Sequence, residues 1–153
     1  MTRWAMVADL RRCVGCQTCN AACKHANATP PGVQWRRVLD MEFGEYPDVQ
    51  RAFVPVGCQH CDEPPCMDVC PTTATKQRAD GIVTIDYDLC IGCAYCSVAC
   101  PYQARSFVHE PLDGQKPDVP RGKGCVEGCT LCVHKVDRGE SPACVSACAS
   151  AGH

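Results

Sequence analysis

Residues 90–101 of the chain read CIGCAYCSVACP: four cysteines separated by two, two and three residues and followed by a proline. In a run with this spacing, the tight two-residue gaps bend three thiolates around one face of a [4Fe-4S] cube. The fourth cysteine follows on a departing helix and ligates the other cluster of a pair. Gly92 suits the loop because its backbone has conformational freedom and can aim N–H groups at sulfide. This stretch therefore predicts a small fold organised around iron–sulfur clusters.

The same pattern recurs three more times along the chain. The first group, at residues 13–23, has the spacing of the run at 90–100, and an offset of 77 also places Asp9 on Asp86. The second group, at residues 58–70, and the fourth, at residues 129–148, have longer central gaps but keep the final three-residue gap. Their first two cysteines coincide at an offset of 71. These matches indicate an internal duplication in which each half contributes two groups.

Cysteine content leaves three explanations, and spacing separates them. The chain has 153 residues and 17 cysteines, so ordinary core packing cannot be its main stabiliser. Tetrahedral zinc needs two cysteine pairs and has no use for a third cysteine two residues on. Disulfides are disfavoured by the odd count and by the many pairs too close in sequence to staple a fold. Iron–sulfur clusters are the favoured interpretation, and a zinc-stabilised interaction module is an alternative.

Cys125 is the seventeenth cysteine and stands outside the four groups. It lies four residues before Cys129. We expect a free thiol here, and the alternative is a ligand that replaces Cys129.

Composition and motifs exclude several classes of function. The formal charge of -2 and the scattered Lys and Arg residues argue against nucleic-acid binding. No apolar run approaches the ~18 residues that a membrane-spanning helix needs, so membrane contact would come through a partner. The N-terminal residues 1–10 lack the pattern of a secretory signal. No catalytic triad, P-loop or dinucleotide fingerprint accompanies the cysteines, and we expect no substrate chemistry on this chain.

The local patterns predict a loop-rich α+β fold. β-branched and apolar residues bounded by turn formers predict short strands at 4–10, 51–56, 82–86 and 104–108. Ala-rich segments after the third cysteines of the first and third groups predict one or two helical turns.

Two stretches fall outside the repeat, and we expect loops or insertions there. They are residues 26–50, with Trp35, Phe43 and Tyr46, and residues 109–124. The aromatic side chains of the first stretch either mark a docking surface for another subunit or pack onto their own domain.

Several short motifs carry a resemblance to a known family. They are CQHC at 58–61 with EPPC at 63–66, CIGC at 90–93, CPY at 100–102, and CTLC at 129–132 followed by PAC at 142–144. Together with MVAD at 6–9, they resemble the four-cluster iron–sulfur subunits of the dimethyl sulfoxide reductase family of molybdenum enzymes. The match covers nearly the whole chain.

The resemblance implies a duplicated bacterial-ferredoxin-like fold with four [4Fe-4S] clusters. Groups one and four would share one unit, residues 1–25 plus 110–153, and groups two and three another, residues 51–109. Residues 26–50 would be an insertion and a candidate subunit-docking loop. The implied ligand sets are Cys13, Cys16, Cys19 and Cys148; Cys129, Cys132, Cys144 and Cys23; Cys58, Cys61, Cys66 and Cys100; and Cys90, Cys93, Cys96 and Cys70.

Charge balance points to nearby donors that would tune the clusters. Sixteen thiolates and four oxidised cores would change the formal charge from -2 to roughly -10, since the cores bring about +8. His60, Lys24 and Arg105 are the candidate tuning residues, and Lys135 also lies near a cluster motif. A solvated loop position is the alternative for each.

By resemblance, the chain would relay electrons between a large molybdenum or tungsten bis-pterin catalytic subunit and a quinone-reactive membrane anchor or another acceptor. The substrate of such a complex would be a sulfur oxyanion, and arsenate, polysulfide and aromatic-acyl-CoA enzymes are the alternatives. A polyferredoxin-like carrier for a hydrogenase is the alternative function. We expect a cytoplasmic protein held at the membrane through a partner, with periplasmic co-export beside a signal-bearing partner as the alternative.

Two features depart from the family pattern. Cys148 is followed by Ala149, where relatives usually have proline, and the chain ends at His153, where relatives continue through another strand. We therefore expect the chain to be incomplete.

Overall fold

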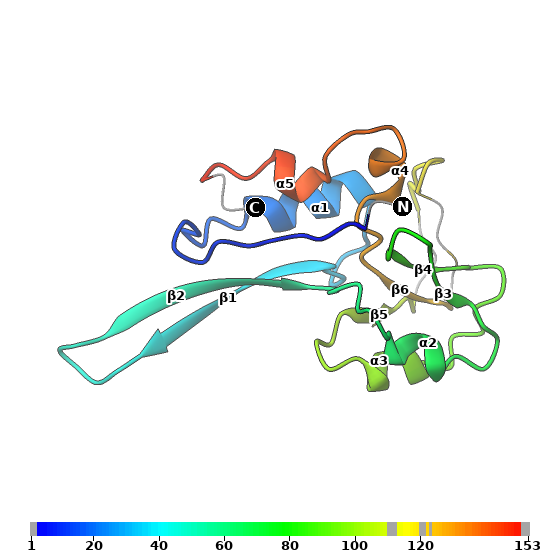
Figure 1. The fold of residues 1–153 in the computed structure, drawn as a ribbon, viewed down its shortest axis with the longest axis horizontal. Helices are drawn as coiled ribbons and strands as arrows, with labels where there is room; N and C mark the ends of the chain where they lie inside the picture. Colours follow the sequence, from blue (N-terminus) through cyan, green and yellow to red (C-terminus); the bar gives the residue numbers. More distant parts are fainter. Residues whose placement is uncertain (1–2, 110–112, 120–121, 123, 151–153) are drawn as a thin grey trace.

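Three antiparallel strand pairs form the framework of the protein. The computed structural model describes residues 3–109, 113–119, 122 and 124–150. Within them, β1 (Arg36–Phe43) pairs with β2 (Gln50–Gly57), β3 (Thr75–Gln77) with β4 (Val83–Ile85), and β5 (Arg105–Phe107) with β6 (Val126–Gly128). The β1–β2 hairpin is much longer than the other two and projects away from the rest of the molecule (Figure 1).

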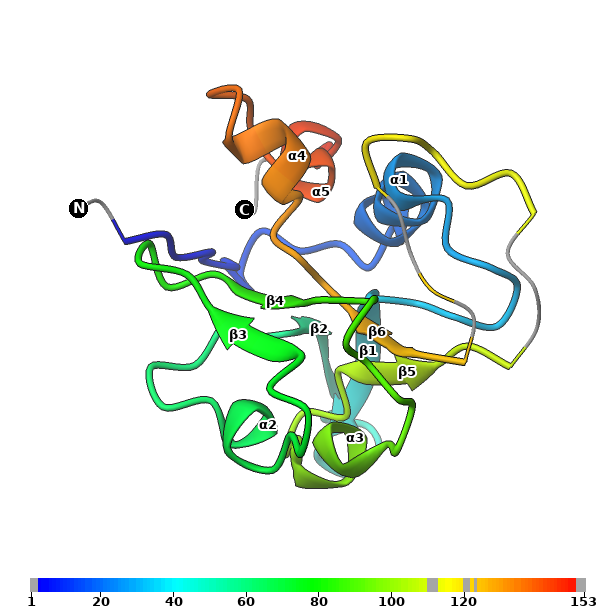
Figure 2. The same ribbon diagram turned by 90° about the vertical axis from the view of Figure 1, so that its right-hand side faces the viewer.

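In the described part of the chain, five helices lie on two sides of these strands. They are α1 (Thr18–Asn27), α2 (Pro65–Asp68), α3 (Tyr95–Ala99), α4 (Val133–Val136) and α5 (Ala143–Ser146). Helix α1 packs against α5, and α2 packs against α3. In both views the α1–α5 pair lies above the short strands and the α2–α3 pair lies below them (Figures 1 and 2). The two helix pairs therefore bring together distant parts of the chain: group one with group four, and group two with group three.

The loops of the first and third groups adopt the same backbone geometry. Gly15 and Gly92 both have φ of 69°. Gln17 and Ala94, which precede α1 and α3, have φ of 60° and 61°. Left-handed conformations at non-glycine residues are costly, so the same unusual geometry at both positions is a specific feature of these loops. The sequence repeat at an offset of 77 is matched by this repeat in the backbone.

The β1–β2 hairpin corrects the loop that we expected at residues 26–50. Arg36–Phe43 is a strand, and it pairs along its whole length with Gln50–Gly57. The predicted strand at 51–56 is confirmed as part of β2. The turn between the strands contains Gly44, Pro47 and Asp48, which are typical turn residues, so the sequence did carry a hairpin signal.

The other strand predictions had mixed outcomes. Those at 82–86 and 104–108 are confirmed by β4 and β5. The strand at 4–10 was wrong, because these residues belong to no described strand; Trp4 N–H donates to the Asp80 carbonyl (3.1 Å) and Val7 is largely exposed. The described residues of the 109–124 stretch form neither helix nor strand; residues 110–112, 120–121, 123 and the chain end at 151–153 lie outside the described residues.

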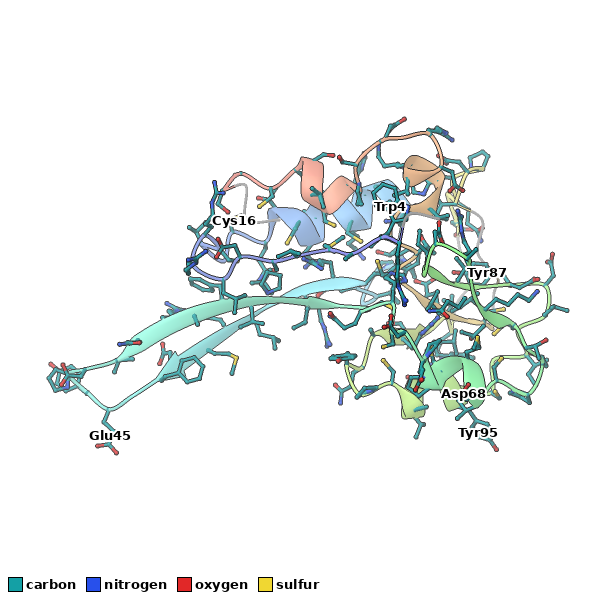
Figure 3. All side chains as sticks on the ribbon, viewed as in Figure 1. Trp4, Cys16, Glu45, Asp68, Tyr87 and Tyr95 are labelled. Carbon is teal, nitrogen blue, oxygen red and sulfur yellow. The ribbon has the colours of Figure 1, made fainter. Side chains whose placement is uncertain are left out.

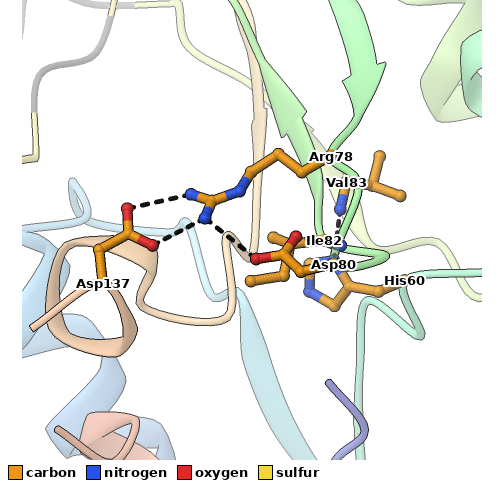
Figure 4. A network of polar contacts seen from close by, with 6 residues as sticks. All are labelled: His60, Arg78, Asp80, Ile82, Val83 and Asp137. Carbon is orange, nitrogen blue, oxygen red and sulfur yellow. Dashed lines mark hydrogen bonds and ion pairs between the residues drawn. The ribbon is translucent and has the colours of Figure 1, made fainter. Parts of the chain in front are cut away.

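Polar contacts and small apolar clusters both connect the parts of the molecule. Trp35 is buried at the base of the hairpin, and its Nε1–H donates to the buried Glu127 carboxylate (3.1 Å) on β6. Arg78, just after β3, donates to both carboxylate oxygens of Asp137 (3.0 and 2.7 Å), just after α4, and to Asp80 (Figure 4). These contacts fasten the hairpin and the group-four segment to the short strands.

Replacing Gly92 by alanine tests the close packing of the third-group loop. A Cβ at Gly92 would overlap the Gly124 carbonyl oxygen, in addition to the strain of φ 69°. Positive φ costs about 1–2 kcal/mol for an L-residue, and overpacking typically adds ~1–3 kcal/mol. We expect Gly92→Ala to lower the thermal unfolding temperature far more than Gly114→Ala. Gly114 has φ 70° with no atom within 4 Å of the added Cβ, so it carries the backbone strain alone. Equal losses in the two variants would contradict this packing.

Candidate metal centres

The third cysteine of every group has the same place on a helix. Cys19, Cys66, Cys96 and Cys144 are each the second residue of a helix, in α1, α2, α3 and α5 respectively. All four are buried. The helix starts are set by local sequence: a left-handed residue precedes α1 and α3, and α2 begins with a proline, which is favoured at the first helical position. Every group thus places its third thiol, buried, at the second position of a helix.

Twelve of the motif cysteines surround three cavities. We call them cavity A (about 350 Å³, part of it open space), cavity B (about 320 Å³) and cavity C (about 310 Å³). Each is lined by three cysteines of one group and the last cysteine of another, and cavity A is also lined by Cys58. The sets are Cys129, Cys132, Cys144 and Cys23 for cavity A; Cys90, Cys93, Cys96 and Cys70 for cavity B; and Cys58, Cys61, Cys66 and Cys100 for cavity C.

The crossing of the last cysteine follows from the helix pairs. Cys70 comes after α2 yet lines cavity B, and Cys100 comes after α3 yet lines cavity C. Because α2 and α3 pack against each other, each helix delivers its departing thiol to the neighbouring group. In the α1–α5 pair, Cys23 lies within α1 and lines cavity A. Cys148 lies close enough to Cys16 for its charge to oppose ionisation of that thiol. The ligand sets themselves stay a prediction.

Burial and crowding hold several of these thiols in the protonated form. Burial raises the pKa of Cys23 to about 12, and the neighbouring Cys132 and Cys144 thiols contribute to the rise. Burial likewise raises the pKa of Cys129, with Cys23 adding to the effect. Crowded thiolates are stable only beside positive charge, which the iron of a cluster would supply. The donor set therefore fits a multi-iron cluster chemically.

Nitrogen donors point at the sulfur atoms of the same cysteines. Arg105 is buried on β5, and its Nη2 donates to Cys66 Sγ (3.2 Å). Asn27 at the end of α1 donates to Cys23 Sγ (3.6 Å) and faces Cys132 Sγ (3.9 Å). The backbone N–H of Leu131 donates to Cys129 Sγ (3.4 Å). Such hydrogen bonds stabilise negative charge on sulfur and orient the ligands.

The other predicted tuning residues have different surroundings. His60 Nδ1 accepts a hydrogen bond from the Val83 N–H (3.0 Å, Figure 4). Burial is the larger cause, and the positive charge of Arg105 the smaller one, that lower the pKa of His60 to about 4. The imidazole is therefore neutral, with its proton on Nε2. Lys24 Nζ donates to the carbonyls of Thr29 (3.1 Å) and Pro30 (2.6 Å), and so holds the loop after α1. Lys135 forms an ion pair with Glu140.

The surroundings of Cys125 differ from those of Cys129. The Cys125 Sγ donates to the carbonyl oxygens of Tyr87 and Cys90 (3.5 Å each). It lines none of cavities A, B and C, whereas Cys129 lines cavity A. This geometry favours Cys129 as the ligand.

The part of the chain that the structure describes contains neither a site for a single metal ion nor a membrane-spanning helix. Across residues 3–109, 113–119, 122 and 124–150, no group of three or more His, Cys, Asp or Glu side chains is placed to hold a single metal ion. None of the helices found in those ranges has the length and apolar character to cross a bilayer.

Comparison with known proteins gives consistent matches. The model of the 4Fe-4S dicluster domain family matches residues 49–152. The chain is 44% identical to the B subunit of tetrathionate reductase from Salmonella typhimurium, with 95% of this chain and 54% of that protein aligned. It is 40% identical to the B subunit of selenate reductase from Mesobacillus selenatarsenatis, over 95% of this chain and 57% of that protein. It is 35% identical to the arsenate respiratory reductase iron–sulfur subunit of Shewanella sp., over 97% of this chain and 79% of that protein.

The chain is shorter than each of these relatives. It spans little more than half the length of the first two and about four fifths of the third.

Serine substitutions at Cys129 and Cys125 test which of these two cysteines is a ligand. We expect Cys129→Ser to remove about four iron atoms per chain, because a [4Fe-4S] cluster needs four thiolates. Cys125→Ser should leave the iron content unchanged, since its thiol faces backbone carbonyls. Iron and acid-labile sulfide assays on the anaerobically isolated chain measure both. Loss of iron in Cys125→Ser with retention in Cys129→Ser would reverse the assignment.

Proposed function

Because the chain belongs to the 4Fe-4S dicluster domain family, we propose that it is the electron-transfer subunit of a molybdenum or tungsten bis-pterin oxidoreductase. The relatives named above are B or iron–sulfur subunits of reductases, and the family resemblance predicted from the sequence is thereby confirmed. The crossed cysteine sets around cavities A, B and C are the observation that carries the proposal. They favour paired clusters over isolated metal sites.

In this proposal the chain holds four clusters in two interlocked pairs of a duplicated ferredoxin-like fold. The α1–α5 pair would serve groups one and four, in the unit of residues 1–25 and 110–153 beyond which α1 continues to Asn27, and the α2–α3 pair, within residues 51–109, would serve groups two and three. The equal φ values at Gly15 and Gly92 support the duplication. A [4Fe-4S] cluster, when bound, takes up and releases one electron.

The contacts between the cysteine sets suggest the order in which they follow one another. Cys19 and Cys144 lie close enough to interact by charge, which connects the Cys13–Cys19 set with cavity A. Cys58 lines both cavity A and cavity C. Cys66 and Cys96 interact across the α2–α3 pair, which connects cavity C with cavity B. We infer a single row: the first-group set, cavity A, cavity C and cavity B.

The protein's own residues would hold and insulate this row. The buried third cysteines keep water from the clusters, and Arg105, Asn27 and backbone N–H groups offset the charge on sulfur. His60, Lys24 and Arg105 were predicted from the sequence to tune the clusters. Of these three, Arg105 donates a hydrogen bond to a cysteine sulfur, that of Cys66. In this proposal the chain relays electrons and has no catalytic residue of its own.

The partners follow from the proposed role. A large catalytic subunit carrying the pterin cofactor would exchange electrons with one end of the row, and a quinone-reactive membrane anchor or another acceptor with the other end. By their names, the relatives are subunits of tetrathionate, selenate and arsenate reductases, which supports an oxyanion of sulfur or a related element as the substrate class. Contact with the membrane would come through the anchor.

We propose that one face of the β1–β2 hairpin docks onto the large subunit. Leu39, Met41 and Phe43 alternate along β1, so they lie on the same face, and all three are exposed. The turn, where Glu45 is labelled, lies far from the body of the protein (Figure 3). An exposed apolar face that its own domain leaves uncovered is typical of an interaction surface. Trp35, by contrast, packs onto its own domain.

Copurification tests the proposed function. The tagged chain, expressed with the genes that surround its own, should bring down a large subunit that contains a pterin cofactor, detected by its oxidised fluorescent derivative. The reduced clusters of the same complex should be reoxidised when the substrate oxyanion is added. Repeated isolation of a stable cluster-bearing chain alone, or with a hydrogenase, would contradict the proposal.

The hairpin surface has a separate test. We expect Met41→Glu to reduce recovery of the large subunit about tenfold, because a charge buried at an interface costs several kcal/mol when it is unpaired. Glu42→Gln, on the opposite face of the same strand, should not change the recovery. Iron content should be unaffected in both. Full recovery with Met41→Glu would exclude this face as the docking surface.

A further inference from the structure

Arg36 is a buried cation whose role is not explained by the contacts described so far. It is only 9% exposed, at the start of β1. Its Nε and Nη2 atoms are buried and have no hydrogen-bond partner among the described residues. A buried guanidinium with unpaired donors is costly, so this arrangement indicates a missing acceptor. Arg36 lines cavity A, where the Cys23, Cys129, Cys132 and Cys144 thiols meet.

The two halves of the chain place Arg36 and Arg105 in the same way. Arg36 is the first residue of β1 and lies opposite Gly57, the residue before Cys58. Arg105 is the first residue of β5 and lies opposite Gly128, the residue before Cys129. Each arginine thus starts a strand that pairs with the strand leading into the first cysteine of the next group.

Each arginine side chain passes close to the glycine opposite it on the partner strand. A Cβ at Gly57 would lie 3.7 Å from Arg36 Cδ, and a Cβ at Gly128 would lie 3.2 Å from Arg105 Cδ. Both added atoms would also come within 3 Å of a backbone carbonyl, that of Trp35 or Ala104. In each hairpin, therefore, the arginine crosses over a glycine on the partner strand, and the equivalence extends to the path of the side chain.

The cavities that the two arginines serve are equivalent as well. Arg105, which follows group three, lies in cavity C with the group-two cysteines and donates to Cys66 Sγ (3.2 Å). Arg36, which follows group one, lies in cavity A with the group-four cysteines. Its charge lowers the pKa of Cys144 and Cys23, against the larger effect of burial. The duplication that relates group one to group three, and group two to group four, thus also relates Arg36 to Arg105.

We propose that Arg36 is a potential-setting residue for the cluster of cavity A, and that its unpaired donors serve that cluster as Arg105 serves the cluster of cavity C. In the row inferred above, cavities A and C are the two inner positions. The inner clusters would each have a buried guanidinium, which favours their reduced, more negative state. This inference rests on the proposed function, because it requires bound clusters.

Redox titration of the iron-loaded protein, followed by electron paramagnetic resonance, tests the inference. Arg36→Gln should lower the reduced-to-oxidised ratio of one cluster at least tenfold at a fixed applied potential. This change corresponds to a fall of about 59 mV in the reduction potential of that cluster for one electron. Arg105→Gln should shift a different cluster in the same direction, and the double variant should show both shifts. Arg51→Gln is the matched control, because Arg51 on β2 loses the same charge at an exposed position. It should shift no cluster.

The outcomes separate this inference from the proposed function. A wild-type chain without iron and sulfide would overturn both. A fully loaded Arg36→Gln protein in which no single cluster shifts, or in which all shift equally, would overturn the role of Arg36 alone. If Arg36→Gln loses one cluster, the potential of that cluster is measured in Arg36→Lys, which keeps the charge but not the forked donors. A potential below that of the wild type supports the role of these donors, and an unchanged potential overturns it.

Discussion

The constraint on which this structure depends is the burial of crowded thiols. Cys19, Cys66, Cys96 and Cys144 are all buried, and burial raises the pKa of Cys23 to about 12. The apolar core offers little else: the two clusters of buried residues contain four and three members, and cysteines make up half of the first. A chain built in this way gains its stability when positive metal replaces the thiol protons. That accounts for one-turn helices and three-residue strands in a protein of this length.

The thiols also explain where the charged and polar groups lie. Arg105 is buried beside Cys66, and Asn27 faces two cysteine sulfurs from the end of α1. Arg36 is buried with unpaired donors at cavity A. Elsewhere such groups would be liabilities in an interior. Around the sixteen thiolates that four clusters would require, they would oppose the accumulation of negative charge, and their unequal distribution would give the positions along the proposed row different electrostatic surroundings.

The sequence predicted features that depend on local spacing and missed those that depend on tertiary contact. The helical turns at Cys19 and Cys96 follow from the cysteine gaps and the Ala-rich segments after them. The β1–β2 hairpin was missed because residues 26–50 fall outside the cysteine repeat and were interpreted as an insertion, although Leu39 and Met41 alternate with Asp40 and Glu42 as in a strand. Asn27 and Arg36 could not be singled out, because they meet cysteines of distant groups only in the folded chain. The place of Arg36 opposite Gly57, at the start of β1, becomes visible once the strand pairing is known.

The most direct measurement of the central claim is the iron and acid-labile sulfide content of the anaerobically isolated chain. Four [4Fe-4S] clusters predict about sixteen atoms of each per chain. They also predict a broad visible absorption that bleaches on reduction by dithionite. Zinc without sulfide, or about eight irons with half of the motif thiols still reactive toward alkylating reagents, would contradict the account.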